Sequence, residues 1–272
     1  MSFNIFRKES SNENLSESQM DYLKSKMVNP IADPVNIKLL SHLTRKQREK
    51  FSLYSKTVTL YFGEEVAELI NIEETSAMRS MPKGYTPEKL IGLNIGCGGR
   101  TISPFLLPVD IMRENTFGQS QGEHGALTNS AFLALSDDLP FKSETVDYIV
   151  ALHMLEHIED PVSTINHWLD TLKPGGGIGL VLPDWRYTWD SRNDRAPFSH
   201  KWNPTPSLMR QLYEKHWSGK SYLETCDTYD FAMSFDVVLR KHGEFKPFCG
   251  PDPEKILSGY ERHQQGIFLH GD

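Results

Sequence analysis

The centre of the chain alternates short apolar runs with longer polar or amphipathic stretches, and this alternation constrains the fold more than any other feature. Five runs have the length and composition of buried strands; they cover residues 89–96, 106–112, 131–135, 146–152 and 177–182. A helical pattern over residues 153–172 follows the fourth run. Strands separated by crossovers pair in parallel, so we expect an α/β fold with a Rossmann-like, doubly wound, mostly parallel sheet.

The sequences on either side of this centre differ from it. Residues 1–85 begin with a tail rich in Ser, Asn and Glu, and amphipathic spacing over 35–70 then predicts a helical N-terminal extension. Residues 86–184 form the predicted core. Residues 185–272 hold four of the five tryptophans, and we expect the remaining sheet elements there. The pattern in this last part predicts helices over 206–217 and 229–242 and a strand over 266–270.

Composition excludes several classes of protein. No apolar run approaches the roughly 20 residues that a membrane span needs. The formal net charge of −7 argues against a protein that binds nucleic acid through its overall field. The three cysteines, Cys97, Cys226 and Cys249, are too few and too scattered for a disulfide framework or a cysteine zinc site. Because the N-terminus also lacks the apolar core of a secretory signal, we expect a cytoplasmic protein.

A glycine turn and an acidic residue end the first two apolar runs. The string Gly96-Cys97-Gly98-Gly99 permits positive φ angles and a close approach of the backbone to a ligand. It matches neither the dinucleotide fingerprint GxGxxG nor the phosphate loop GxxxxGK[ST], so it indicates either a ligand-binding turn or a plain strand-ending turn. Asp110 ends the second run, where its carboxylate can accept hydrogen bonds from ribose hydroxyls or cap the next segment.

Five strings together carry a family resemblance. LNIGCGGR, VDI, DDLPF, VDYIVALHMLEHIEDP and LKPGGGIGLVLPD occur in this order within residues 89–184, about a third of the chain. This series resembles class I S-adenosylmethionine-dependent methyltransferases, and more narrowly the small-molecule group with LPF, LEH and LKPGG motifs. The string LPDWRYTWDSR and the later His200 resemble a subgroup associated with polysaccharide and other glycan biosynthesis. The resemblance implies S-adenosylmethionine as the cofactor.

The resemblance also implies where that cofactor would bind. The residues concerned are Asn94, Gly96, Cys97, Gly98, Asp110, Ser136, Asp137 and His153. Gly96, Cys97 and Gly98 would face the methionine part, and Asp110 would bind the ribose hydroxyls. Ser136 and Asp137 would lie beside the adenine, and His153 near the transferred methyl group. The family often has an acidic residue at the position of Leu135, so the adenine contact can pass to Asp137 or to backbone groups.

His153, Glu156 and His157 stand at spacings that place all three on one side of a helix. HxxEH is also the string of inverted zinc peptidases, but here it directly follows a strand, which disfavours a peptidase. Three interpretations remain: a structural Glu-His pair, His153 as general base for an acceptor hydroxyl, or a divalent metal bound by His153, Glu156 and His157. The last resembles the Glu-x-x-Glu-His metal face of some O-methyltransferases, including quinone and small-RNA enzymes, with His200 as an additional ligand.

Residues 185–272 are the predicted acceptor-binding region. Trp185, Arg186, Tyr187 and His200 are candidate substrate-binding residues because aromatic faces suit sugar rings, although the same aromatics could pack as core. Asp184 is a second candidate base. We therefore expect an O-methyltransferase acting on a hydroxyl of a sugar, a glycan or another small polar acceptor, with or without a metal. The alternatives are an RNA methyltransferase and a non-catalytic S-adenosylmethionine-binding regulatory protein.

Overall fold

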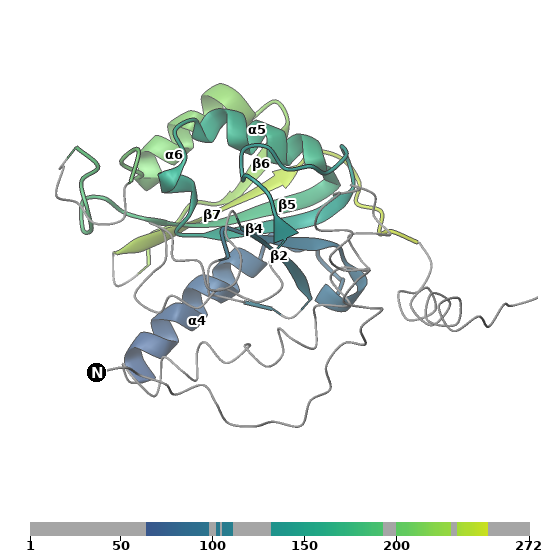
Figure 1. The fold of residues 1–272 in the computed structure, drawn as a ribbon, viewed down its shortest axis with the longest axis horizontal. Helices are drawn as coiled ribbons and strands as arrows, with labels where there is room; N and C mark the ends of the chain where they lie inside the picture. Colours follow the sequence, from purple (N-terminus) through teal and green to yellow (C-terminus); the bar gives the residue numbers. More distant parts are fainter. Residues whose placement is uncertain are drawn as a thin grey trace, which may run out of the picture.

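The computed structural model of the protein describes residues 64–97, 102–103, 105–110, 132–192, 200–229 and 233–249. Within these ranges seven strands form one sheet: β1 (Gly92–Ile95), β2 (Leu106–Asp110), β3 (Phe132–Leu133), β4 (Val146–Leu152), β5 (Leu172–Pro183), β6 (Ser221–Thr225) and β7 (Ser234–Lys241). The strand order is β3-β2-β1-β4-β5-β7-β6 (Figure 1). Strands β1 to β5 pair in parallel, whereas β7 is antiparallel to β5 and β6. The predicted Rossmann-like, mostly parallel sheet is confirmed.

Helices cover both faces of this sheet. The described helical elements are the α-helices α4 (Glu64–Met78), α5 (Pro161–Thr171) and α6 (Pro206–Leu212), the single-turn 3-10 helices η1 (Pro87–Lys89) and η2 (Leu155–His157), and the π-helix η4 (Tyr213–Trp217). Figure 1 shows α4 on one face and α5 and α6 on the other, which is the doubly wound arrangement. None of the helices in the described ranges has the length and apolar character that crossing a membrane requires. The predicted helix over 206–217 is confirmed by α6 and η4.

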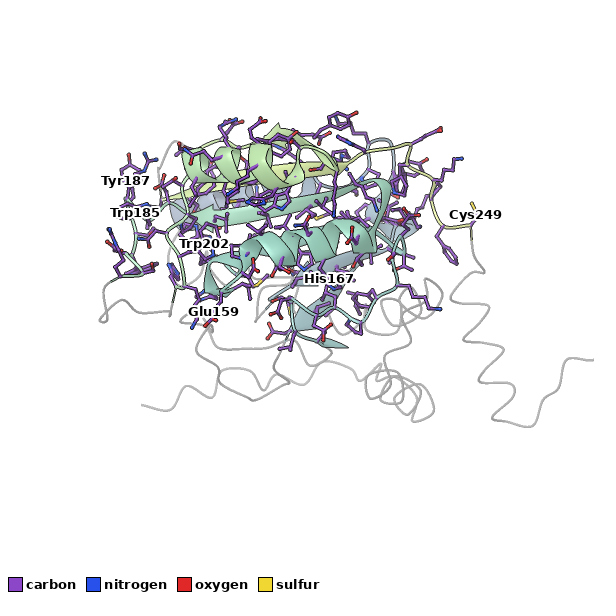
Figure 2. All side chains as sticks on the ribbon, turned by 90° about the horizontal axis from the view of Figure 1, so that it is seen from above. Glu159, His167, Trp185, Tyr187, Trp202 and Cys249 are labelled. Atoms are coloured by element: carbon purple, nitrogen blue, oxygen red, sulfur yellow. The ribbon has the colours of Figure 1, made fainter. Side chains whose placement is uncertain are left out.

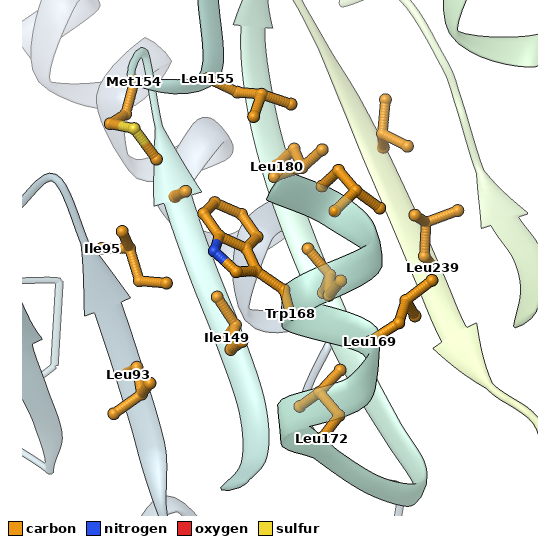
Figure 3. Close-up of a cluster of buried hydrophobic side chains, with 14 of the residues drawn as sticks. Leu93, Ile95, Ile149, Met154, Leu155, Trp168, Leu169, Leu172, Leu180 and Leu239 are labelled. Carbon is orange, nitrogen blue, oxygen red and sulfur yellow. The ribbon is translucent and has the colours of Figure 1, made fainter. Parts of the chain in front are cut away.

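Alternating side chains of β4 pack into two separate hydrophobic clusters, one on each face of the sheet. Ile149 lies on the face toward α5, where the indole of Trp168 is fully buried against the sheet (Figure 3). Tyr148 and Val150 lie on the opposite face, in a second cluster that includes Ala77 of α4. A strand that is buried on both faces explains why the sequence of β4 reads as a continuous apolar run.

Helix α4 lies within the segment expected to be an extension, yet it packs directly onto the sheet. A Cβ atom on Gly179 of β5 would lie 2.0 Å from the carbonyl oxygen of Ala77. The guanidinium of Arg240 on β7 donates hydrogen bonds to the carbonyl oxygens of Ser80 (2.6 Å) and Arg79 (2.9 Å), just past the end of the helix. The C-terminal end of the helix is therefore fixed in two ways: by its backbone contact with β5 and by the positively charged guanidinium of Arg240.

The predicted helix over 153–172 is too long. Residues after β4 form only the turn η2, and the α-helix begins at Pro161. Asp160 caps it by accepting a hydrogen bond from the backbone N–H of Ser163 at 2.9 Å, and proline at the first helical position favours this start. His153, Glu156 and His157 consequently do not share one face of an α-helix.

The predicted helix over 229–242 is wrong, because most of it forms β7. The first six residues of β7 are buried, since the strand lies between β5 and β6. A short apolar run buried on both sides does not show the alternation that separates strands from helices. Strands β6 and β7 are sheet elements within residues 185–272, where the remaining ones were expected. The predicted strand over 266–270 lies outside the described residues, as do residues 35–63.

We predict that Gly179→Ala destabilises the protein by about 2 kcal/mol or more, because overpacking a tight backbone contact forces the helix and strand apart. The contact concerned is the 2.0 Å approach of the added Cβ to Ala77 of α4. Urea denaturation followed by circular dichroism measures the change. Gly219→Ala is the matched control, since a Cβ at that position meets nothing within 4 Å. Equal stability of the two variants would contradict the prediction.

Candidate active site

The carboxyl ends of β1, β2 and β4 meet at one edge of the sheet. Ile95 of β1 is paired with Val109 of β2, and Asn94 of β1 with Val150 of β4. Because all three strands run in parallel, the residues that follow them emerge side by side. Gly96, Asp110 and His153 are those residues or lie within one position of them.

Gly96 makes a turn that only glycine can make without strain. Its φ angle is +63°, and a Cβ atom there would lie 2.1 Å from Cγ of Met154. The backbone N–H of Gly96 donates to the carbonyl oxygen of Val109 at 2.8 Å, and that of Cys97 donates to the same oxygen at 3.3 Å. The turn is therefore held against the end of β2. Gly98, predicted to continue it, lies outside the described residues.

Asp110 places a carboxylate next to this turn. It is the last residue of β2 and is 8% exposed, and its Oδ2 lies 4.0 Å from the Sγ of Cys97. Asn94 is buried within β1. The structure thus brings together Gly96, Cys97 and Asp110, which the family resemblance predicts around one ligand.

Ser136 and Asp137 lie in the turn that follows β3. The backbone N–H of Ala134 donates to the carbonyl oxygen of Asp110 at 3.2 Å, which joins this segment to the end of β2. The carbonyl oxygen of Ser136 accepts a 2.6 Å hydrogen bond from the buried indole of Trp168. The side chain of Asp137 is exposed. The core tryptophan therefore anchors the loop that the family resemblance predicts beside an adenine.

His153 follows β4 directly and has an unusual backbone. Its φ angle is +50°, in the left-handed region that is uncommon for a non-glycine residue and that often occurs at functional sites. Its N–H donates to the carbonyl oxygen of Val181 at 2.9 Å, which fixes it to β5. Its Nε2 lies 3.0 Å from Oε1 of Glu73, a buried carboxylate of α4. Sequence reasoning missed Glu73, since nothing in the pattern of α4 links it to a residue 80 positions away.

Glu156, His157 and His200 form a second group close to His153. Each offers one ligand atom, and these atoms lie within 4.8 Å of one another. His153 does not belong to this group, whereas His200, predicted only as an additional ligand, does. The backbone explains the difference: His153 ends β4 with a left-handed φ, while Glu156 and His157 lie in the separate turn η2.

Burial shifts the titration of two members of this group. Burial raises the pKa of Glu156 to about 7, although the nearby His153 partly opposes this. Burial lowers the pKa of His200 to about 4, and the neighbouring His157 and His153 lower it further. His200 is therefore a neutral imidazole at neutral pH, the form that can act as a ligand or acceptor.

The segment after β5 carries the predicted acceptor residues at one end of the molecule. Figure 2 shows Trp185 and Tyr187 there, at the end opposite Cys249. Tyr187 is 57% exposed and lies under the guanidinium of Arg186, whose carbon is 5.5 Å from the ring centroid. Trp189 is partly exposed and its ring meets that of His200 with centroids 5.9 Å apart. Tyr187 is thus a surface feature, and Trp189 is the aromatic residue of this segment that adjoins His200.

Asp184, predicted as a second base, is poorly placed for that role. Its side chain is fully buried, and Arg186 donates from Nε to Oδ1 at 2.9 Å and from Nη2 to Oδ2 at 2.5 Å. With both oxygens bound to a guanidinium, the carboxylate stabilises the loop and holds Arg186. The positive charge of Arg186, a predicted substrate-binding residue, is therefore paired with Asp184 of the same loop.

Comparison with known proteins assigns the chain to a family. The profile of a family described as a methyltransferase domain matches residues 72–237, which is more than half of the chain. The chain belongs to this family. Residues 72–237 are thus a methyltransferase domain, for which S-adenosylmethionine is the methyl donor. The matched range includes part of α4 as well as β6 and part of β7.

Two curated relatives resemble this methyltransferase over part of their length. An uncharacterized protein of Methanocaldococcus jannaschii, MJ1123, is 31% identical over 136 residues, which cover 49% of this chain and 61% of the relative. The ubiquinone biosynthesis O-methyltransferase of Cereibacter sphaeroides is 24% identical over 147 residues, which cover 45% and 58%. The chain thus spans about three fifths of the length of each relative.

Solved structures show more distant likenesses. The PH0226 protein from Pyrococcus horikoshii has a TM-score of 0.46 and 15% identity, covering 71% of this chain and 98% of its own. An S-adenosylmethionine-dependent methyltransferase from Mesorhizobium loti has a TM-score of 0.41 and 12% identity, covering 56% and 91%. Both scores lie below 0.5, so these likenesses add nothing to the fold described above.

The residues at the strand ends fit the cofactor of this methyltransferase domain. The Gly96 turn can admit a ligand close to the backbone, and the two oxygens of Asp110 can accept hydrogen bonds from a pair of hydroxyl groups. Ser136 lies on the continuation of β3, which pairs with β2 beside Asp110. These are the residues that could hold the ribose and its flanking groups.

We predict that Asp110→Ala weakens binding of S-adenosylhomocysteine by about 10- to 150-fold, because hydrogen bonds to a charged group contribute about 1.5–3 kcal/mol. Isothermal titration calorimetry on the full chain measures the affinity. Asp170→Ala, which removes an exposed aspartate of α5, serves as the control. Unchanged affinity in the Asp110 variant would remove this residue from the cofactor site.

Proposed function

We propose that this methyltransferase methylates a hydroxyl group of a small polar acceptor, with sugars and glycans as the preferred class. The observation that carries the proposal is the hydrogen-bonded pair of His153 and Glu73 beside Gly96 and Asp110. A hydroxyl group that keeps its proton is a poor nucleophile, so its methylation needs a base. A histidine held by a buried carboxylate can serve as that base.

His153 acts as the general base in this proposal. The bound cofactor supplies an electrophilic methyl group on its sulfonium. His153 accepts the proton that the acceptor hydroxyl loses as its oxygen forms the new bond to carbon. Since its Nε2 pairs with Glu73, the basic lone pair of the neutral ring is on Nδ1. The fixed backbone of His153, bonded to β5, holds the ring in place while the proton moves.

Glu73 is a positioning residue for His153. Its carboxylate is buried and lies 3.0 Å from Nε2, so it selects the tautomer and stabilises the charged ring that forms. It reaches the site only because α4 lies in backbone contact with β5. The N-terminal segment of the chain thereby contributes to the chemistry at the end of β4.

The acceptor class rests on the segment from Trp185 to Trp189. Tyr187 is exposed, Trp189 is partly exposed and adjoins His200, and polar groups alternate with these rings. Aromatic faces beside hydrogen-bonding groups suit the apolar faces and hydroxyls of sugars. The formal net charge of −7 places neutral, hydroxyl-rich acceptors ahead of nucleic acid.

Transfer from methyl-labelled S-adenosylmethionine to a panel of sugars, nucleotide sugars, phenols, carboxylic acids and RNA tests the proposed function. We expect label in a hydroxyl-bearing acceptor, as a methyl ether that resists mild alkali. Label in RNA, or in a methyl ester that alkali releases, would overturn the acceptor class. Tight S-adenosylhomocysteine binding without transfer to any member would favour a non-catalytic binding protein.

We predict that His153→Ala lowers kcat by at least about 100-fold, the usual contribution of a general base, and leaves S-adenosylhomocysteine affinity nearly unchanged. Glu73→Gln is expected to lower kcat by about 10-fold with the KM for the cofactor unchanged, and Glu73→Asp to restore part of the loss. Steady-state kinetics and calorimetry separate these effects. His242→Ala, on the tail that follows β7, is the control. Full turnover by the His153 variant would end its role as base.

A further inference from the structure

We propose that Glu156, His157 and His200 bind one divalent metal ion of the zinc type. The three ligand atoms lie within 4.8 Å of one another. Two imidazoles and one carboxylate form a ligand set that suits zinc and its transition-metal neighbours better than magnesium or calcium, which prefer oxygen ligands. The site goes beyond methyl transfer, because it can form whether or not the acceptor assignment is correct.

The spacing of the three side chains fits a cation between them. Oε1 of Glu156 lies 3.8 Å from Nε2 of His157 and 3.9 Å from Nε2 of His200. These separations exceed hydrogen-bonding distance. Ligands about 2.0–2.1 Å from a tetrahedral zinc ion are about 3.4 Å apart, so small side-chain movements would complete the site.

The buried carboxylate of Glu156 lacks a hydrogen-bond partner among the described residues. Its Oε2 makes no hydrogen bond there, and its Oε1 lies 3.8 and 3.9 Å from the two imidazoles, beyond hydrogen-bonding distance. An unpaired buried polar atom costs about 1–3 kcal/mol, and more when it is charged. A divalent ion would compensate the carboxylate charge that burial otherwise disfavours.

Backbone contacts already hold the ligands of the two segments together. The N–H of Lys201 donates to the carbonyl oxygen of Glu156 at 2.7 Å, and the indole of Trp202 donates to that of Leu155 at 3.0 Å. These bonds place His200 against η2, so the ligands are brought together before an ion binds. Simple packing of rings accounts for the His157–His200 contact at 5.0 Å, but it does not account for a buried carboxylate beside them.

Three protein ligands leave a further coordination position. In catalytic zinc sites that position takes water or a substrate oxygen. Here the group borders both His153, which acts electrostatically on Glu156, and Trp189, which contacts His200. The site therefore lies between the proposed base and the proposed acceptor segment.

Metal binding is tested directly on the full chain after treatment with EDTA and gel filtration. Calorimetric titration with ZnCl₂ should give one ion per chain, and CoCl₂ should produce the intense visible absorption of a low-coordinate cobalt site. Competition by Zn²⁺ should remove that absorption. Absence of Zn²⁺ binding in calorimetry, or a cobalt spectrum equal to that of the aqueous ion, would overturn the proposal.

Ligand assignment is tested with Glu156→Gln, His200→Gln and His157→Gln. Each should weaken Zn²⁺ affinity by at least about 100-fold, since loss of even an outer-shell partner costs 10- to 100-fold. His157 is the least buried of the three, so its variant provides the test if the other two fail to fold. His216→Gln, in η4, is the matched control and should bind Zn²⁺ like the unmodified chain. Unchanged affinity in folded ligand variants would overturn the assignment.

The metal site and the proposed function fail in different ways. Zinc affinity and the cobalt spectrum require no acceptor, so they report on the site even if no methylated product is found. Conversely, hydroxyl methylation that persists with the metal site abolished would leave the role of His153 in place. The affinity for S-adenosylhomocysteine shows whether a variant has damaged the cofactor site. We expect this affinity to be unchanged in the His157 variant.

Discussion

The structure depends on the burial of β1 between β2 and β4. All four residues of β1 are buried, and the strand is paired in parallel on both sides. A parallel strand of this kind fixes where its neighbours end, because a slip in register would bring a side chain to the position of Gly92, where the ring of Tyr148 and the side chain of Leu106 leave no room for a Cβ atom. The turn at Gly96, the carboxylate of Asp110 and the ring of His153 therefore follow from one register. A loop-based site would need separate contacts to hold each of them.

Close contact between α4 and β5 extends that constraint to the opposite face. Gly177 and Gly179 lack the side chains that would hold the helix away, and carbonyl oxygens of Ser80 and Ala77 approach them directly. Helix α4 then carries Glu73 to His153 across 80 residues of sequence. The glycines of β5 set the distance between the sheet and α4. They thereby affect His153, the proposed base, through the position of Glu73.

The sequence predicted those parts of the fold and site that local patterns encode. Apolar runs located the five parallel strands, and the glycine turn and Asp110 met at one edge because parallel strands end together. Local patterns failed where tertiary contacts decide: β7 reads as a helix because both its faces are buried. They also failed at His153, because its left-handed backbone means that no α-helix continues from it to Glu156 and His157. They missed Glu73 because its contact with His153 depends on packing between distant segments.

The charges around His153 connect the proposed base with the proposed metal site. Glu156 is coupled electrostatically to both His153 and Glu73. A cation bound by Glu156 would neutralise that carboxylate and leave Glu73 as the carboxylate that orients the ring of His153. The proposed base and the proposed metal site therefore share one buried group of charges, and a change at either site acts on the other through Glu156.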